Sequence, residues 1–280
     1  DGAHEPAPPG ALLPPVQRAS DPALHRRLVV GVAAALGATL LVLLGFLGSS
    51  IATGRALASF GPDELVVEVT GLQWWWRVTY PSEPASGTVE TANEIHVPVG
   101  RVVRLDLSAG DVIHSFWVPR LHGKRDLIPG RATQIRLRAD APGVYEGQCA
   151  EFCGHQHANM NLVVVAEPPA EFERWLAAQR ALAQAPATPD EQRGQQVFAT
   201  RGCLLCHAIR GTDANGRTGP DLTHLASRRG IAANARPNAT GHLAAWILDP
   251  QGTKPGARMP AIPMTGDELQ PLLAYLRSLR

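Results

Sequence analysis

The feature that most restricts the fold is an uncharged segment near the start of the chain. No charged residue occurs between Leu28 and Gly54, and residues 28–47 are almost entirely apolar. A helix of that length would span about 40 Å, against roughly 30 Å for the hydrocarbon core of a membrane. A buried helix of a soluble domain and the core of a signal peptide fit less well, because the run is long and no small-residue cleavage pattern ends it. The sequence therefore predicts one transmembrane helix over residues 28–54.

Charges at the two ends of this segment predict its orientation. Arg18, Arg26 and Arg27 precede it, whereas only Arg55 follows closely. Because positively charged flanks remain in the cytoplasm, the polar, proline-rich residues 1–27 are predicted to be cytoplasmic. The remainder of the chain is then expected on the opposite side of the membrane.

Composition narrows the class of partner. The formal net charge is +1, and charged residues make up 18% of the 280 residues. No basic stripe or basic arm occurs, so nucleic acid is not expected as a partner. The length is sufficient for about two domains.

After the apolar segment, the hydrophobic pattern changes to a period of two. Residues 60–168 contain short alternating runs, such as Leu65 with Val67, and turn signals such as Pro129-Gly130 separate them. Many short strands at this spacing predict an all-β sandwich.

The last part of the chain is predicted to be small and helical. Residues 169–189 suggest one helix followed by a proline- and alanine-containing linker, and Asp190 can cap a new helix. Residues 266–279 have the apolar spacing of an amphipathic helix. Residues 190–280 are therefore expected to form a separate all-α domain.

The four cysteines occur as two close pairs, which suggests metal, cofactor or redox use. The second pair, in Cys203-Leu-Leu-Cys206-His207, has the pattern for covalent attachment of a c-type haem. The two thiols can add to the vinyl groups, and the adjoining histidine can bind the iron. A thioredoxin-like redox pair is the main alternative, but no βαβ pattern surrounds this one.

A second axial ligand to this haem is expected downstream. Met259 is the first candidate, because His with Met raises the reduction potential of the iron, as an electron carrier requires. The alternatives are Met264, His224 and His242.

The first cysteine pair lies in a segment with a soft set of ligand atoms, Cys149-Ala-Glu-Phe-Cys153-Gly-His-Gln-His157-Ala-Asn-Met160. Two thiolates, an imidazole and a thioether suit copper. A Cys149–Cys153 disulfide, a zinc site completed by His114 or His155, and a mononuclear blue-copper site are the alternatives. Met160 argues against zinc, and the second cysteine argues against blue copper. Two thiolates can instead bridge two copper ions.

This segment resembles the dinuclear copper (CuA) loop of cytochrome c oxidase subunit II, whose pattern is C-x-E-x-C-x-x-x-H-x-x-M. The resemblance covers about residues 28–166 and includes three further motifs: Gln73-Trp-Trp-Trp76, His114-Ser-Phe-Trp-Val-Pro119 and Asp126-Leu-Ile-Pro-Gly-Arg131. With the haem motif appended, the chain is similar to the cytochrome c-fused variety of that subunit. Beside the one transmembrane helix predicted above from the apolar segment, the resemblance implies a cupredoxin-like sandwich and a class I cytochrome c domain.

The resemblance also assigns roles to residues of this sequence. It implies that Cys149 and Cys153 bridge two copper ions, with His114, His157, Met160 and the backbone carbonyl of Glu151 completing the centre. The side chain of Glu151 would reach a magnesium ion at the boundary with subunit I. Trp74 would be the exposed point at which electrons arrive. His155 and His122 are expected not to be ligands. The stretch Gly219-Pro220-Asp-Leu resembles the loop whose proline carbonyl accepts a hydrogen bond from the proximal histidine, here His207.

The function implied by the resemblance is electron delivery to a respiratory haem–copper oxidase. Electrons from cytochrome c or a bc-type complex would pass through the haem and the copper pair to subunit I, which reduces oxygen to water beside other oxidase subunits. The location implied is the plasma membrane of a bacterium, with both domains on the extracytoplasmic side. The family usually has two membrane helices, and a cytoplasmic N-terminus is what remains if the first of them lies upstream of residue 1.

The sequence leaves two other functions open. One is electron delivery to a CuA-containing nitric oxide reductase, and the other is a membrane-tethered copper delivery or sensing protein. Neither a nucleophilic triad nor paired catalytic carboxylates are apparent, so hydrolysis is not expected.

Overall fold

The computed structural model describes residues 21–58 and 64–280 of the chain. Most of the predicted cytoplasmic segment lies outside the described residues. The contacts divide the chain into two compact units, residues 1–60 and residues 61–280. Each unit is described by itself.

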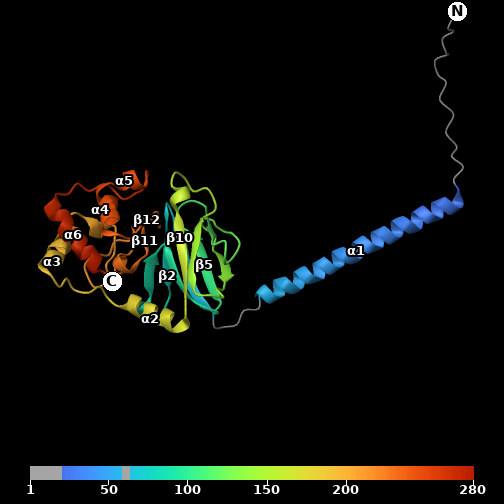
Figure 1. Cartoon of the computed structure of the whole chain (residues 1–280), viewed down its shortest axis with the longest axis horizontal. Helices are drawn as coiled ribbons and strands as arrows, with labels where there is room; N and C mark the ends of the chain where they lie inside the picture. Colours follow the sequence, from blue (N-terminus) through green and yellow to red (C-terminus); the bar gives the residue numbers. More distant parts are fainter. Residues whose placement is uncertain (1–20, 59–63) are drawn as a thin grey trace, which may run out of the picture. The chain divides into compact units, whose positions relative to one another are not determined.

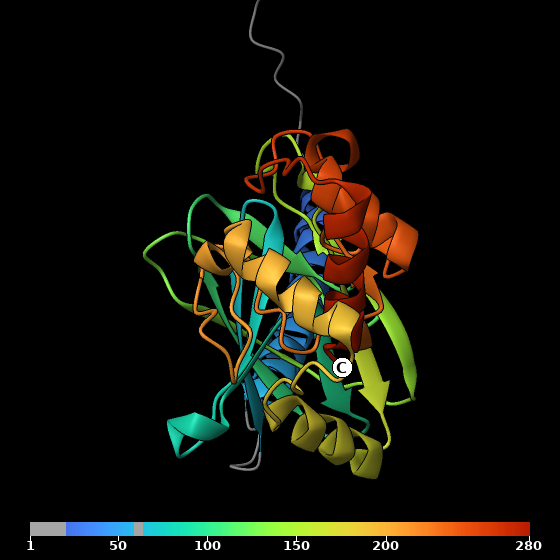
Figure 2. The same cartoon turned by 90° about the vertical axis from the view of Figure 1, so that its left-hand side faces the viewer.

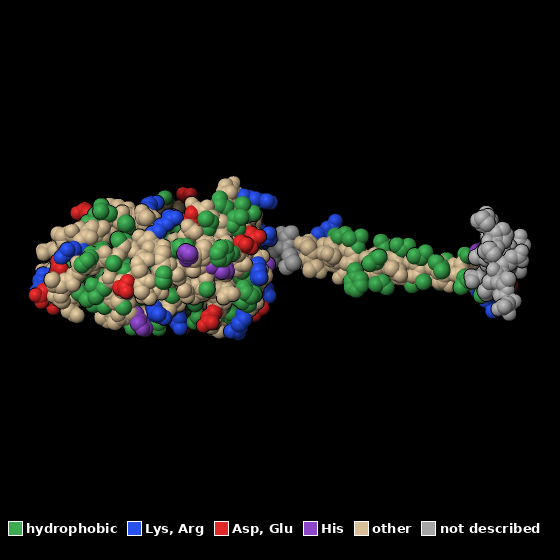
Figure 3. Space-filling model, turned by 90° about the horizontal axis from the view of Figure 1, so that it is seen from above, with side chains coloured by type: hydrophobic (Ala, Val, Ile, Leu, Met, Phe, Trp, Pro, Cys, Tyr) green, Lys and Arg blue, Asp and Glu red, His purple; other side chains and the backbone are tan. Residues whose placement is uncertain are grey.

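The first unit contains one long helix, α1 (Pro22–Ala58). It begins six residues before the predicted start, because Pro22 suits the first helical position and Asp21 Oδ1 accepts a hydrogen bond from the Ala23 N–H at 2.9 Å. Apolar side chains line much of the visible face of this helix, with backbone and other side chains between them (Figure 3). Over Pro22–Arg55 it is long and apolar enough to cross a membrane.

The second unit begins with a sandwich of two five-stranded sheets (Figure 1). The first sheet has the order β3-β2-β1-β5-β8, formed by β1 (Leu65–Leu72), β2 (Trp75–Tyr80), β3 (Val89–Ala92), β5 (Val103–Ala109) and β8 (Thr133–Leu137). The second has the order β4-β10-β9-β6-β7, formed by β4 (Glu94–Pro98), β6 (His114–Trp117), β7 (Arg125–Leu127), β9 (Gly143–Cys149) and β10 (Asn161–Glu167). Strand β1 pairs in parallel with β5, and β10 pairs in parallel with β4, whereas the other pairs within the two sheets are antiparallel.

The core of the sandwich follows the alternation seen in the sequence. Val67 and Val69 of β1 and Leu105 of β5 are fully buried. The residues that alternate with them along each strand are at least partly exposed. Helix α2 (Pro169–Arg180) also belongs to this core, because its Phe172 and Leu176 are buried against the sheet residues. The first half of the segment predicted as helix and linker is therefore part of the β domain.

A small helical domain with its own apolar core follows. Its main helices are α3 (Pro189–Thr200), α4 (Thr240–Leu248), α5 (Pro250–Thr253) and α6 (Gly266–Ser278). Two short strands, β11 (Gly230–Ile231) and β12 (Arg236–Pro237), pair with each other. Thr188, rather than the predicted Asp190, caps α3. Its hydroxyl accepts a hydrogen bond from the Glu191 N–H, and the Glu191 carboxylate accepts one from the Thr188 N–H.

Helices α3 and α6 cross at very short range, as seen in gold and red in Figure 2. A side chain at Gly194 would place its Cβ 2.0 Å from the carbonyl oxygen of Pro271, so only glycine permits this approach. Pro271 lacks the N–H that would bond to Asp267 O, and Arg193 donates to that oxygen instead at 3.0 Å. Phe198 of α3 and Leu272 and Leu276 of α6 line an apolar cavity beside this crossing.

Candidate metal and haem sites

Strand pairing brings together residues that lie far apart in the sequence. His114 starts β6 and Cys149 ends β9, and these strands pair so that Phe116 lies opposite Cys149. The Cys149 N–H donates to Met160 O at 3.0 Å, and the Ala150 N–H donates to Ser115 O at 2.9 Å. The loop between β9 and β10 is thereby closed at its base, with its cysteines facing inward.

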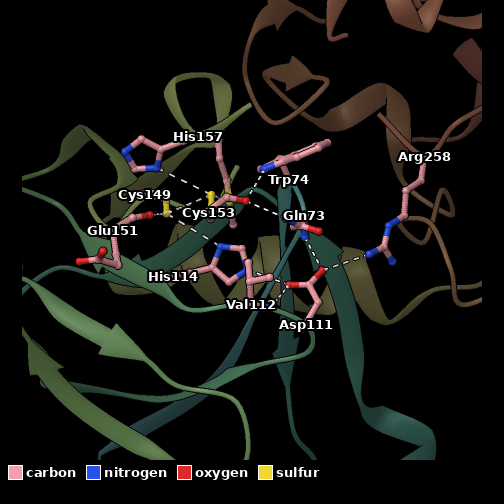
Figure 4. A network of polar contacts seen from close by, with 11 residues as sticks. Gln73, Trp74, Asp111, Val112, His114, Cys149, Glu151, Cys153, His157 and Arg258 are labelled. Atoms are coloured by element: carbon pink, nitrogen blue, oxygen red, sulfur yellow. Dashed lines mark hydrogen bonds and ion pairs between the residues drawn. The ribbon is translucent and has the colours of Figure 1, made fainter. Parts of the chain in front are cut away.

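The candidate ligand atoms form one connected cluster (Figure 4). Cys149 Sγ lies 3.8 Å from Cys153 Sγ and 3.9 Å from His114 Nδ1. Cys153 Sγ lies 3.7 Å from His157 Nδ1 and 3.8 Å from Met160 Sδ. Each cysteine therefore has one imidazole beside it, and both sulfurs face the same space.

The remaining predicted ligand is also near. Glu151 O lies 3.2 Å from Cys149 Sγ, so the backbone carbonyl of this residue and not its exposed carboxylate faces the cluster. The two cysteines are free thiols at a separation far beyond a disulfide bond of about 2.05 Å. His155 is exposed, and His122 is exposed with Nδ1 near Gly123 O, so neither belongs to the cluster.

This donor set fits copper. Two thiolates, two imidazoles and a thioether are soft and borderline ligands, and a thioether is unusual for zinc. His114, Cys149, Cys153 and Met160 are each at most 3% exposed, so a metal held there would be shielded from water. The atoms around a buried site rearrange little when a metal there gains or loses an electron, which suits electron transfer.

A hydrogen bond links the two thiols, so the protonation of one affects the pKa of the other. The hydrogen bond between them lowers the pKa of Cys149 to about 3, whereas the same bond and burial raise the pKa of Cys153. One thiolate is thus already favoured before a metal binds.

Asp111 orients one of the two imidazoles, a role that sequence reasoning missed. Its Oδ1 lies 2.9 Å from His114 Nε2, which leaves Nδ1 directed toward Cys149. Burial raises the pKa of Asp111, but hydrogen bonds from the Gln73 N–H, His114 and the Val112 N–H outweigh it and lower the pKa overall. The spacing of Asp111 three residues before His114 was a signal that could have suggested this pair.

An apolar cavity of about 220 Å³ lies in the helical domain, and residues of the β domain such as Trp74 complete its lining. The residues of the haem motif, Cys203, Cys206 and His207, line it together with Met259. Met264 packs on the domain core without lining the cavity. Both ring nitrogens of His224 bond to backbone carbonyls, those of Arg280 and Ala181, and His242 is exposed. Met259 is thus the better-placed of the candidate axial ligands.

The proximal side of this cavity is built to hold an imidazole in one orientation. His207 Nδ1 lies 2.7 Å from Pro220 O and donates to it, so Nε2 is free to bind a metal. Gly219 makes the approach possible, because a Cβ there would lie 2.5 Å from His207 Cε1. Burial lowers the pKa of His207, which keeps the ring neutral and able to act as a ligand. The residues present therefore fit a covalently attached haem.

Trp74 lies between the two sites. Its Nε1 donates to Cys153 O at 2.8 Å, and Gln73 Nε2 donates to the same oxygen at 2.8 Å. The indole also lines the cavity that holds Cys203 and Cys206, and it packs over Gly256 of the helical domain. Whereas the sequence suggested an exposed ring, this one is partly buried, because the helical domain covers it.

The peptide bond between Gln73 and Trp74 is cis. The Trp74 carbonyl accepts from the side chain of Lys254, a buried residue that sequence reasoning also missed.

The fold and the two clusters define a class of protein in which a β-sandwich metal domain is joined to a c-type cytochrome domain. Residues 82–167 match the family model for the periplasmic domain of cytochrome c oxidase subunit II, and residues 191–280 match that for cytochrome c. The chain therefore contains a domain of the cytochrome c oxidase subunit II family, followed by a cytochrome c domain.

Individual relatives agree with this family. Cytochrome c oxidase subunit 2 of Alkalihalophilus pseudofirmus is 39% identical over 221 residues, which cover 79% of this chain and 63% of the relative. The corresponding subunit of Bacillus sp. PS3 is 33% identical over 230 residues, covering 78% of this chain and 63% of the relative. The chain therefore spans about 63% of the length of each of these two relatives.

Among solved structures, the chain is similar to the periplasmic domain of subunit II of cytochrome oxidase of Bradyrhizobium japonicum. The two are 32% identical with a TM-score of 0.40, and the match covers 43% of this chain and 96% of that one.

Proposed function

We propose that this chain takes electrons onto its haem and passes them through a dinuclear copper centre to the catalytic subunit of a respiratory haem–copper oxidase. The observation that carries the proposal is the place of Trp74. Its indole donates to the carbonyl of Cys153 and also lines the cavity that contains the haem motif. One side chain therefore contacts both candidate redox sites.

The copper centre is assigned to the cluster at the base of the β9–β10 loop. Cys149 and Cys153 would supply the shared thiolates, and His114 and His157 would each supply one imidazole. Met160 and the carbonyl of Glu151 would be the weaker ligands. The sulfur separation of 3.8 Å, with one imidazole nitrogen within 3.9 Å of each sulfur, supports this arrangement.

The haem is assigned to the cavity of the helical domain, attached through Cys203 and Cys206. When bound, it supplies a one-electron couple. The chain keeps His207 neutral and oriented through Pro220, and Met259 would offer its sulfur from the lining of the same cavity. Apolar lining residues exclude water, which limits the reorganisation that accompanies a change of charge.

The proposed partners and location are those that the similarity to subunit II suggests. The membrane is the plasma membrane of a bacterium, with the copper and haem domains on its extracytoplasmic side, and helix α1 is the anchor. Cytochrome c or a bc-type complex is the donor, and subunit I, beside other oxidase subunits, is the acceptor that reduces oxygen to water with proton translocation. The exposed carboxylate of Glu151 is free to reach a magnesium ion at the boundary with subunit I.

Metal analysis and electron paramagnetic resonance of the purified membrane complex test this proposal. We expect two copper ions and one covalent haem in each copy of the chain, and a mixed-valence copper signal. A mononuclear copper signal, or no copper, would reject the assignment. Turnover with oxygen rather than with nitric oxide identifies the partner as an oxidase. If reduced cytochrome c failed to reduce the copper, a copper delivery or sensing role would be favoured.

A further inference from the structure

Lys254 is a buried cation at the junction between the two domains. It follows α5 in the helical domain, and it is only 3% exposed. The sequence has 26 basic residues of the Lys and Arg type but only two lysines, and the other, Lys124, is exposed on the β domain. Because a lysine is rarely buried to this extent without a charged partner, its surroundings require an explanation.

Three backbone carbonyls surround the Lys254 ammonium. Nζ donates to Trp74 O at 2.6 Å, to Asn159 O at 2.8 Å and to Ala232 O at 3.2 Å. No ion pair to Lys254 is formed within residues 21–58 and 64–280. An ammonium has three N–H donors and a neutral amine has only two, so the three acceptors match the charged form.

These carbonyls come from three separate segments. Trp74 precedes β2, Asn159 precedes the copper ligand Met160, and Ala232 follows β11 of the helical domain. A single side chain thus joins the aromatic segment, the copper loop and the helical domain. Arginine would not serve the same purpose, because its planar fork cannot direct donors at three convergent oxygens.

Burial lowers the pKa of Lys254 to about 7, while negative charge on Cys153 acts in the opposite direction. The charged form, which has the three N–H donors that the three carbonyls require, predominates below this pKa. Removal of the amine would leave three carbonyls without this donor, which is costly for buried groups.

The segment that begins at Lys254 makes two more contacts with the copper domain. Gln156 of the copper loop donates from Nε2 to Pro255 O at 2.8 Å, and Arg258 Nη2 lies 3.7 Å from Asp111 Oδ2 (Figure 4). Gly256 lies under the Trp74 ring, and a Cβ at this position would be 3.5 Å from it. Met259 follows directly, in the lining of the haem cavity.

We propose that Lys254 is a positioning residue that fixes Trp74 and the Met259 segment against the copper loop, and so sets the rate of electron transfer from haem to copper. This inference rests on the proposed function. In the step concerned, ferrous haem loses one electron and becomes ferric, the mixed-valence copper pair gains it and becomes fully reduced, and no proton moves. Lys254 supplies no ligand to either centre and acts through the carbonyls it holds.

Flash photoreduction of the full chain, loaded with haem and copper, measures this step. A photoreductant reduces the haem, and the haem and copper absorptions are followed in time. We expect Lys254→Met to slow the transfer by about tenfold or more, since small displacements of reacting groups have large effects on rate. The absorption spectra and midpoint potentials of both centres should be unchanged. The matched control, Lys124→Met, should transfer at the wild-type rate.

Lys254→Arg separates position from charge. It keeps the positive charge and loses the three-way geometry, so we expect it to remain slow. A wild-type rate in Lys254→Met or Lys254→Arg would overturn the inference, and so would a slower rate explained by shifted potentials. If the wild-type haem did not reduce the copper at all, the proposed function would be the part that fails.

A second measurement does not depend on the folding of a variant. A water-soluble acylating reagent applied to the native full chain should modify Lys124 and leave Lys254 intact, as mass spectrometry of peptides would show. Both lysines should react in the denatured chain. Equal reaction of the two in the native chain would show that the junction is open in solution, and would overturn the inference.

Discussion

The indole nitrogen of Trp74 donates a hydrogen bond to the backbone oxygen of Cys153 at 2.8 Å. This bond ties an aromatic ring in the wall of the haem cavity to a cysteine of the copper cluster. Because it links the two sites directly, its removal should affect the transfer between them more than it affects either site alone.

Trp74→Phe tests this relationship. The variant keeps an aromatic ring and loses the N–H donor, so we expect slower haem-to-copper transfer by about tenfold, with both spectra retained. Flash photoreduction measures the rate. Trp175→Phe, at a partly buried ring on α2 that lines no part of the haem cavity, should behave as wild type. Equal rates in both variants and the wild type would show that the Trp74 bond is not part of the path.

Asp111→Asn tests the orientation of His114. The amide weakens the acceptor for His114 Nε2, and loss of such partners of a ligating histidine commonly lowers metal affinity by about 10- to 100-fold. Competition titration with a copper chelator measures the change. Asp140→Asn, at an exposed surface pair with Arg138, is the control and should leave the affinity unaltered. An unaltered affinity in Asp111→Asn would mean that other contacts hold the ring.

Met259→Leu tests the second axial ligand of the haem. Leucine conserves volume but removes the thioether, so we expect a lower reduction potential of the haem and loss of the iron–sulfur absorption band. Met264→Leu is the matched control, since this side chain packs on the domain core outside the cavity lining. If the potential dropped in Met264→Leu and not in Met259→Leu, the ligand assignment would be reversed.

The stability of the chain should depend on pH through His96. Burial disfavours the charged ring, but hydrogen bonds with Glu167 and Glu94 outweigh it and raise the pKa of His96 above 6.5. Burial likewise opposes the ionised form of Glu94, yet bonds with His96 lower its pKa below 4.5. The interaction of the charged His96 ring with Glu94 stabilises the folded chain at pH values between the lowered pKa of Glu94 and the raised pKa of His96. This stabilisation is lost as the pH rises through the pKa of His96 or falls through the pKa of Glu94.

Thermal unfolding at several pH values measures this dependence. We expect the free energy of unfolding to decrease on the order of 1–2 kcal/mol as the pH rises from 6.5 past the raised pKa of His96. The variant His96→Asn should lack this decrease. A wild-type profile that is flat across this range, or that rises, would contradict the assignment of charge to the ring.

Gly194→Ala tests the crossing of α3 and α6. The added methyl group would lie 2.0 Å from Pro271 O, so the helices must separate, at a cost of about 1–3 kcal/mol or more in the free energy of unfolding. Gly266→Ala, where a Cβ meets nothing within 4 Å, should be neutral or slightly stabilising. Chemical denaturation compares the two, and equal effects would show that the crossing adjusts freely.

Much of this molecule follows from sequence alone, because its strongest signals are local. The twenty residues from Leu28 to Leu47 are almost entirely apolar and need no distant partner to form a membrane-length helix. The alternation at Leu65 and Val67 already defines one buried face of a strand. The spacing Cys203–Cys206–His207 carries its chemistry within five residues, and the copper loop places two cysteines, a histidine and a methionine within twelve.

Only the tertiary structure decided how the two domains are joined. Trp74 and Lys254 are 180 positions apart, and neither shows in its own neighbourhood that it will be covered by the other domain. Asp111 became a partner of His114 because a turn before β6 brings its carboxylate to the ring. Such contacts depend on where separate elements pack, and local sequence patterns describe single elements but not the surfaces at which they meet.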